Sequence, residues 1–251
     1  MTAVVLAGGP RDAVARLEPS APNKAFVALA GKTLLERTLE PLVAVTNIER
    51  IVVVAPPAAQ SLCARYGAGL CRDGATIAAS LRSGLEGLAP DELVLVVSSD
   101  LALLTSAALE SFVTAAIAAD ADVAYACVPK AAHTGRYAAV RHTWAYLREG
   151  AFCGGGCVAL RPRMLPALER FLARLGAARK DPRRLAAIFG ARILIRYATR
   201  RLAIADAERR ARNLLGARVA AIVSSFPEIA VNVDCPADLT MVAAMLSPAS
   251  D

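Results

Sequence analysis

Several catalytic arrangements that a sequence can reveal are missing from this chain of 251 residues. It holds only two histidines, and no Ser-His-Asp, Cys-His or paired-glutamate arrangement stands out. Arrangements of this kind activate nucleophiles or move protons in many enzymes. Their absence agrees with a chemistry that needs no general base.

Aromatic residues are also scarce. They make up 5% of the chain, whereas hydrophobic residues make up 56%. The core must therefore be built mainly from Ala, Val, Leu and Ile. The length is sufficient for one large domain, and we predict a single domain over residues 1–251. The net charge of +7 fits an anionic ligand or surface, without choosing among nucleotide, nucleic acid and membrane.

Long uncharged runs and a cationic leader are absent as well. No stretch approaches the length of a membrane-spanning helix, and we expect no signal peptide because an apolar strand pattern begins at once. The six cysteines are scattered, which predicts reduced thiols and a cytoplasmic protein. Cys153 and Cys157 flank three glycines, but His133 and His142 are not at ligand spacing, so a zinc site is disfavoured.

Two nucleotide-binding motifs are incomplete. Gly31-Lys32-Thr33 is similar to the end of a Walker A loop, but Phe26 stands where that motif requires glycine. Adjacent Gly8 and Gly9 are followed by proline, so no G-x-G-x-x-G follows the first strand. A P-loop and a dinucleotide fingerprint are both disfavoured.

The N-terminal segment that remains is suited to a polyphosphate. Residues 3–7 are an apolar run that predicts a buried strand, and two glycines follow it. Glycine allows a sharp turn and exposes N–H groups to a ligand. The loop beyond carries Arg11 and Lys24, and an apolar pattern at helical spacing begins at Lys32. Together these groups favour binding of negative charge.

Three segments of this region resemble the start of the nucleotidyltransferase family: Leu6-Ala7-Gly8-Gly9, Asn23-Lys24-Ala25-Phe26 and Leu29-Ala30-Gly31-Lys32-Thr33-Leu34-Leu35. That family includes molybdenum cofactor guanylyltransferases, sugar-1-phosphate nucleotidylyltransferases and the cytidylyltransferase of isoprenoid synthesis. Its usual opening is L-A-G-G-x-G-x-R-M, then P-K, then G-x-P-L-L. Here the second loop glycine is missing and the arginine sits at Arg11. Asn23 replaces the proline before the lysine, and Thr33 replaces the second proline.

The resemblance implies a fold and a set of phosphate contacts. The fold is a Rossmann-like three-layer α/β/α sandwich with a mostly parallel, mixed central sheet, of the nucleotide-diphospho-sugar transferase type. Lys24 would neutralise the α-phosphate, and Arg11 would hold the β- and γ-phosphates with the glycine turn. The implied nucleotide-binding residues are Leu6, Ala7, Gly8, Gly9, Gly74 and Ser80. The match at the last two is loose, and a plain helix start explains them equally well.

Two further apolar runs predict strands in the first half of the chain. Residues 51–55 would complete a parallel βαβ unit. Residues 93–97 lead to Ser98-Ser99-Asp100, at the strand end where open α/β sheets collect ligands. Thr105 would then cap a helix over about 106–119. In the family this succession presents a metal-binding aspartate, which makes Asp100 a candidate ligand. The alternative is a loop aspartate that caps a turn.

The middle of the chain offers weaker signals. Residues 122–128 predict a strand, and residues 136–142 are a candidate strand of the same sheet. His142 and Trp144 are interpreted as surface or packing residues. Three glycines at 154–156 lead into another strand and permit close approach to the backbone. The family often has Gly-Gly-Asn there, near the acceptor, which makes Gly155 and Gly156 candidate acceptor contacts.

Residues 161–218 change character and predict a basic helical insertion. They carry roughly sixteen Arg and Lys residues against about four acids. One interpretation is a set of amphipathic helices on the sheet with solvated arginines. The other is a basic, apolar surface that contacts anionic lipid or an apolar phosphate. We expect no nucleic acid, because few aromatic residues able to stack on bases, Tyr197 among them, are interleaved with the basic ones.

The C-terminal part restores the family pattern. Residues 219–223 predict a strand, and residues 228–239 predict a strand, Asp234 and a helix that begins with Pro236. In the family, the aspartate of a V-D-x-P-x-D-L segment lies beside the first aspartate and completes the metal site. Asp234 matches that position. Asp238 falls in the first helical turn, where a carboxylate suits the positive helix end, so its role is structural.

These observations predict a Mg²⁺-dependent nucleotidyltransferase that moves a nucleoside monophosphate from a triphosphate to a phosphorylated acceptor and releases pyrophosphate. Such an acceptor is already ionised, so the enzyme must align two anions and absorb charge. Asp100 and Asp234 would hold the metal. Two alternatives stay open: cytidylyl or guanylyl transfer to a lipid or isoprenoid phosphate at a membrane, and a non-catalytic nucleotide sensor or membrane adaptor. The sequence indicates neither base, acceptor nor oligomeric state.

Overall fold

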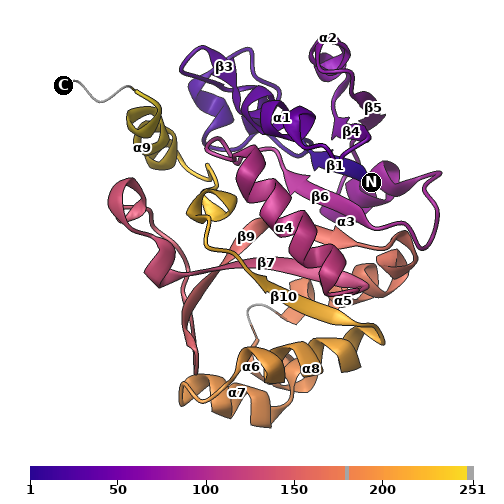
Figure 1. Ribbon diagram of the computed structural model, residues 1–251, viewed down its shortest axis with the longest axis vertical. Helices are drawn as coiled ribbons and strands as arrows, with labels where there is room; N and C mark the ends of the chain where they lie inside the picture. Colours follow the sequence, from indigo (N-terminus) through magenta and orange to yellow (C-terminus); the bar gives the residue numbers. More distant parts are fainter. Residues whose placement is uncertain (179–180, 248–251) are drawn as a thin grey trace.

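The computed structural model describes residues 1–178 and 181–247. Within these residues, eight strands form one mixed sheet (Figure 1). They are β1 (Thr2–Leu6), β4 (Arg50–Ala55), β5 (Gly69–Arg72), β6 (Val94–Ser98), β7 (Val123–Pro129), β8 (Ala145–Leu147), β9 (Gly150–Leu160) and β10 (Val219–Val223). A separate hairpin pairs β2 (Ala28–Leu29) with β3 (Lys32–Thr33).

The strand order is β10-β7-β9-β6-β1-β4-β5, with β8 paired to β9. The pairs β1–β4, β1–β6, β4–β5 and β7–β10 are parallel. The long strand β9 runs antiparallel to β6, β7 and β8. The sheet is therefore mostly parallel with one reversed strand inside it, as predicted.

Helices connect the strands and cover both faces of the sheet. They are α1 (Leu34–Ala44), α2 (Gln60–Arg65), α3 (Ile77–Leu85), α4 (Ser106–Ala118), α5 (Leu165–Ala178), α6 (Pro182–Phe189), α7 (Ala191–Ala198), α8 (Ile204–Leu215) and α9 (Pro236–Leu246). In Figure 1, α1 and α4 lie in front of the sheet, and α6, α7 and α8 gather at the bottom of the view.

Alternation along the strands explains the layers. Side chains of successive strand residues point to opposite faces. Val5 of β1 joins the core cluster that contains Leu39 of α1 and Phe112 of α4. Its neighbour Val4 joins a different cluster with Leu81 and Leu85 of α3. Helices on both faces thus bury the sheet, which confirms the three-layer α/β/α sandwich.

The predicted strands at 3–7, 51–55, 93–97, 122–128 and 219–223 are confirmed within a residue or two at their ends. The helix expected over 106–119 is confirmed too, and Thr105 caps it: its Oγ1 accepts a hydrogen bond from the Ala108 N–H at 3.2 Å. These elements were predictable because buried parallel strands are nearly continuous apolar runs.

Three local predictions are wrong. Residues 136–142 are not a strand, because a short 3-10 turn over Gly135–Tyr137 interrupts them. Within 228–233, Pro227–Ala230 forms another 3-10 turn, which Pro227 begins. The first helix starts at Leu34, since Lys32 and Thr33 belong to the β2–β3 hairpin and Thr33 forms a capping box with Glu36.

The basic section contains α5 to α8, which lie between β9 and β10 in the chain. Helix α5 contacts α3, and α8 contacts β10. Part of the positive charge is paired: Arg196 lies 3.0 Å from Asp206, and Arg212 lies 3.7 Å from Glu208. None of the described helices has the length and apolar character needed to cross a bilayer.

Gly84 sets how closely α3 packs on the sheet. A Cβ at this position would lie 2.5 Å from Val4 Cγ1 and 2.8 Å from Val54 Cγ2. Gly84→Ala should therefore lower the free energy of unfolding by about 1–3 kcal/mol, the cost of overpacking a core. Urea denaturation of the purified protein measures this change.

Gly176→Ala is the matched control, because Gly176 also lies in a helix but nothing stands within 4 Å of its missing Cβ. It should be neutral or stabilise by up to about 1 kcal/mol, since alanine favours a helix. Equal effects of the two substitutions would contradict the close packing of α3.

Candidate active site

The site begins where β1 and β6 end side by side. The two strands are parallel, and Leu6 of β1 is in register with Ser98 of β6. The Ser99 N–H continues the pairing by donating to the Leu6 carbonyl at 3.2 Å. The glycine turn after β1 and Asp100 after β6 therefore emerge at the same edge of the sheet.

Asp100 is buried there, with 2% of its surface exposed. Its Oδ1 accepts hydrogen bonds from Ser98 Oγ at 2.5 Å and from Asn232 Nδ2 at 2.9 Å. Its Oδ2 lies 2.5 Å from Lys24 Nζ. A buried carboxylate is costly unless it is paired and hydrogen-bonded, and Asp100 meets both conditions.

Lys24 reaches this point from the turn beyond the glycine loop. Asn23, the residue in place of the family's proline, caps that turn by accepting from the Ala25 N–H at 2.9 Å. Its amide also donates to the Ala7 carbonyl at 2.9 Å. The asparagine thus anchors the lysine turn to the end of β1.

The Lys24 ammonium joins two distant parts of the chain. Its Nζ lies 2.5 Å from Asp100 Oδ2, 2.7 Å from Asp234 Oδ1 and 3.1 Å from the Val233 carbonyl oxygen. Burial alone would lower the pKa of Lys24, but the carboxylates of Asp100 and Asp234 outweigh burial and raise it. The side chain is therefore a cation at neutral pH.

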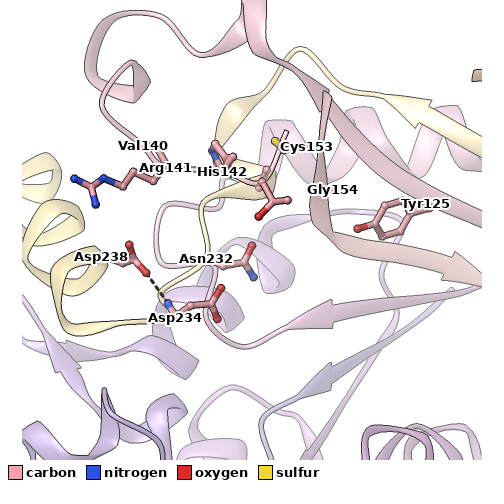
Figure 2. Close-up of a pocket in the computed structure, with 11 residues that line it drawn as sticks. Tyr125, Val140, Arg141, His142, Cys153, Gly154, Asn232, Asp234 and Asp238 are labelled. Carbon is pink, nitrogen blue, oxygen red and sulfur yellow. Dashed lines mark hydrogen bonds between the residues drawn. The ribbon is translucent and has the colours of Figure 1, made fainter. Parts of the chain in front are cut away.

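Asp234 is held beside Asp100 by its own segment. The Val233 N–H donates to the Asp100 carbonyl at 3.1 Å, which brings the segment against the end of β6. The Asp234 N–H donates to Asp238 Oδ2 at 3.0 Å (Figure 2). The Cys235 N–H donates to the same oxygen at 2.9 Å. This capping of α9 confirms the structural role predicted for Asp238. The Asp234 side chain itself is 73% exposed.

The glycine turn meets an acid that the sequence analysis did not single out. The Gly9 N–H donates to Asp73 Oδ2 at 3.3 Å, and Gly9 has a φ of +115°. A Cβ on Gly8 would lie 2.4 Å from Asp73 Cβ. Glycine is therefore required at position 9 for its backbone conformation and at position 8 for space. The Gly9 N–H, which was expected to face phosphate, donates here to the Asp73 carboxylate.

Arg11 turns back onto its own loop. Its guanidinium donates to the Glu18 carbonyl at 3.0 Å and to the Ala15 carbonyl at 3.4 Å. On the other side of the turn, Leu6 is the last residue of β1. The Ala7 N–H that follows it donates to the Val54 carbonyl at 2.9 Å. These contacts fix the loop, and the phosphate role of Arg11 stays a prediction.

Gly74 and Ser80 are in direct contact. The Gly74 N–H donates to Ser80 Oγ at 3.0 Å, and a Cβ on Gly74 would lie 2.5 Å from Ala79 Cβ. Thr76 caps α3 by accepting from the Ala79 N–H at 3.1 Å. The turn is thus closely packed on the helix, which gives both residues a structural role beside the predicted nucleotide contact.

A cavity of about 340 Å³ adjoins Asp234. Figure 2 shows Asn232 and Asp234 on one side of it, with His142, Cys153 and Gly154 across from them. The other lining residues are Tyr125, Val140, Arg141, Thr143, Ala230 and Asp238. Most of the lining is polar, and the cavity is large enough for a small phosphorylated molecule.

The neighbouring glycines of β9 are closely packed. A Cβ on Gly154 would meet the Tyr125 hydroxyl, one on Gly155 would lie 2.9 Å from Ala126 Cβ, and one on Gly156 would lie 2.9 Å from Leu101 Cδ1. Packing therefore explains the glycines at 155 and 156. Their contact with an acceptor stays a prediction.

Sequence comparison identifies the family. Residues 3–215 match the profile of the MobA-like NTP transferase domain. The chain belongs to this family. It is therefore a nucleotidyltransferase enzyme.

Solved structures agree with the assignment to the MobA-like family. A hypothetical transferase from Thermus thermophilus is 32% identical, with a TM-score of 0.83 over 95% of this chain and 98% of the other. The 4-diphosphocytidyl-2C-methyl-D-erythritol synthase of Anaerococcus prevotii has a TM-score of 0.60 at 13% identity, over 98% and 97% of the two chains. No curated protein matches the chain.

A third structure, CMP:2-keto-3-deoxy-manno-octonic acid synthetase complexed with CTP, has a TM-score of 0.57 at 13% identity over 98% of each chain. At that identity the likeness concerns the fold. This MobA-like chain therefore shares the Rossmann-like architecture of nucleotide-diphospho-sugar transferases.

Two partners of Asp100 were missed by the sequence analysis. Asn232 stands two residues before Asp234, and Ser98 stands two residues before Asp100. Both donate to the same carboxylate oxygen. Their spacing is only a weak signal: side chains two residues apart on an extended segment point to the same side.

Lys24→Met should lower the free energy of unfolding by about 1–3 kcal/mol, because it leaves the buried Asp100 carboxylate without its cation. Lys32→Met is the control. Lys32 lies 2.6 Å from Glu40 in a largely exposed ion pair, and its loss should cost about 1 kcal/mol or less. Urea denaturation at pH 7 measures both, and equal costs would contradict the pairing.

The same interaction predicts a pH dependence. The folded-state pKa of Lys24 is raised above its ordinary value, so its stabilising contribution is complete below the unfolded-state pKa and is lost as the pH rises through the folded-state pKa. The stability difference between the wild type and Lys24→Met should therefore shrink at strongly alkaline pH. A difference that grows there would have the wrong sign.

Proposed function

We propose that this enzyme transfers a nucleoside monophosphate from a nucleoside triphosphate to a phosphorylated acceptor, with Mg²⁺ as cofactor and pyrophosphate as the second product. The observation that carries the proposal is the meeting of Asp100 and Asp234 at the Lys24 ammonium. Family membership supports nucleotidyl transfer. The CTP in the CMP:2-keto-3-deoxy-manno-octonic acid synthetase structure supports a triphosphate donor.

The donor set suits Mg²⁺. This ion prefers hard oxygen ligands and is usually bound by one or two carboxylates together with substrate phosphates and water. Asp100 Oδ2 and Asp234 Oδ1 both contact the Lys24 ammonium, so the two carboxylates lie close enough to share a Mg²⁺ ion once that ammonium turns to the α-phosphate. Bound there, Mg²⁺ would offset charge on the reacting phosphates.

The protein's own residues supply alignment and charge. Lys24 keeps its proton, so its ammonium is available to neutralise the α-phosphate. We assign the β- and γ-phosphates to Gly8, Gly9 and Arg11, and the base and ribose to the side of Gly74 and Ser80. A phosphate acceptor is already ionised near neutral pH, so alignment of two anions is the main task.

We assign the acceptor to the cavity beside Asn232 and Asp234. Arg141 on its wall offers positive charge for an acceptor phosphate. Gly154 lines the same cavity, and Gly155 and Gly156 follow it in β9. The six free cysteines agree with the cytoplasmic location that we propose.

Asp100→Asn and Asp234→Asn should each lower kcat/KM by roughly 100-fold or more, because each removes a charged metal ligand while keeping the side-chain volume. The assay measures pyrophosphate release with four nucleoside triphosphates. The acceptor panel holds sugar phosphates, a polyol phosphate, an isoprenoid phosphate and an unphosphorylated sugar acid. Activity should require Mg²⁺ and a phosphorylated acceptor.

Glu92→Gln is the matched control. Glu92 accepts hydrogen bonds from Thr2 at 2.7 and 3.2 Å, at the opposite end of β1. Its substitution should leave kcat/KM unchanged within a few-fold. Full activity in both aspartate variants would refute the metal assignment, and turnover of the unphosphorylated acceptor alone would refute the acceptor class.

Transfer to a lipid-borne or isoprenoid phosphate at a membrane is the second candidate. It is favoured by the exposure of Ile195, 61% of whose surface is open to solvent, in a helix that also carries Arg192 and Arg196. Apolar and basic side chains together bind anionic bilayers. Co-sedimentation with anionic vesicles at low salt, reduced by Ile195→Asp, is expected in this case. Absence of wild-type binding would exclude it.

A further inference from the structure

A second cluster of metal-ligating side chains lies across the cavity from Asn232 and Asp234. Among residues 1–178 and 181–247, His133, His142 and Cys153 converge so that one ligand atom of each lies within 4.8 Å of the others. They come from the turn after β7, the loop before β8 and strand β9. We propose that these three residues form a site for a divalent metal of the zinc type, distinct from the proposed Mg²⁺ site.

The ligand types select the metal. Thiolate sulfur and imidazole nitrogen suit Zn²⁺, whereas Mg²⁺ prefers carboxylate and phosphate oxygens. In a tetrahedral zinc site a sulfur and a nitrogen ligand lie roughly 3.6 Å apart, given Zn–S of about 2.3 Å and Zn–N of about 2.0–2.1 Å. Cys153 Sγ and His133 Nε2 are 4.0 Å apart. A movement of a few tenths of an ångström would bring them to that spacing.

His133 is oriented as a metal ligand should be. Its Nδ1 lies 3.3 Å from the Pro129 carbonyl oxygen, which can accept only if Nδ1 carries the proton. This leaves a lone pair on Nε2, the atom that faces Cys153. Ligating histidines usually donate their other N–H to a carbonyl or carboxylate in this way.

His142 supplies the second observation. Its Nε2 is buried and has no hydrogen-bond partner within the described part of the chain. A buried ring nitrogen without a hydrogen-bond partner is costly as packing alone, and a metal bond would satisfy it.

The surroundings allow a fourth ligand. Cys153 and His133 are buried, with 4% and 9% of their surfaces exposed. His142 and Cys153 also line the cavity beside Asn232 and Asp234 (Figure 2). Three protein ligands and one open position are typical of zinc sites that also bind water or an anion. When the metal binds, the Cys153 thiol releases its proton to solvent.

Co²⁺ is the probe, because its thiolate complex absorbs in the near ultraviolet. The full chain is stripped with a chelator, dialysed and titrated with CoCl₂, without substrate. We expect one Co²⁺ per chain and a thiolate charge-transfer band. Cys153→Ala should abolish the band, and His142→Gln should weaken Zn²⁺ binding by roughly 100-fold or more in a competition assay.

Cys157→Ala is the matched control, because Cys157 is buried in the same strand but lies outside the cluster. It should keep the band. A Zn²⁺ K-edge spectrum of the wild type gives a result that does not depend on variant folding, with one sulfur and two nitrogen ligands expected.

Failure of the wild type to bind Co²⁺, or a band that survives in Cys153→Ala, would show that the cluster is aromatic packing with Trp144, whose ring centroid lies 5.1 Å from both histidines. None of these measurements uses turnover. Their outcome is therefore independent of the proposed nucleotidyl transfer.

Discussion

The contact of one ammonium with two carboxylates organises this protein. Lys24 joins Asp100, at the end of a central strand, to Asp234, which follows much later in the chain. Parallel pairing of β1 with β6 places the glycine turn and Asp100 at one edge of the sheet. The backbone bond from Val233 to Asp100 then brings the C-terminal segment to the same edge. The sheet topology thus brings together the residues to which we assign the substrate phosphates and the metal ion.

The elements that bear this site were predictable where burial leaves a simple pattern. Strands β1, β4 and β6 are apolar runs because helices cover both of their faces, and the N-cap Thr105 marks the start of α4. Lys24, Asp100 and Asp234 were identified through the family resemblance, and the fold does bring them together. The strand pattern failed at 136–142, where a 3-10 turn interrupts the segment, and at 228–233, where Pro227 begins a 3-10 turn whose residues are all buried.

What could not be predicted depends on contacts between irregular segments. Asp73 accepts a hydrogen bond from Gly9 of the glycine turn, 64 residues away in the sequence. No local spacing of residues predicts that contact. His133, His142 and Cys153 lie in two loops and a strand, so their sequence spacing matches no metal motif although their ligand atoms converge. Arg11 was expected to face phosphate, yet its guanidinium binds carbonyls of its own loop. Side-chain direction in a loop depends on contacts that no sequence periodicity specifies.

The proposed function depends on a cation shared by Asp100 and Asp234. A crystal structure with Mg²⁺ and a non-hydrolysable nucleoside triphosphate analogue tests it most directly. We predict one Mg²⁺ ion with an oxygen of each aspartate at about 2.0–2.1 Å and phosphate oxygens completing its shell, with the Lys24 ammonium against the α-phosphate. A triphosphate bound elsewhere, or a Mg²⁺ ion that contacts neither aspartate, would contradict the account.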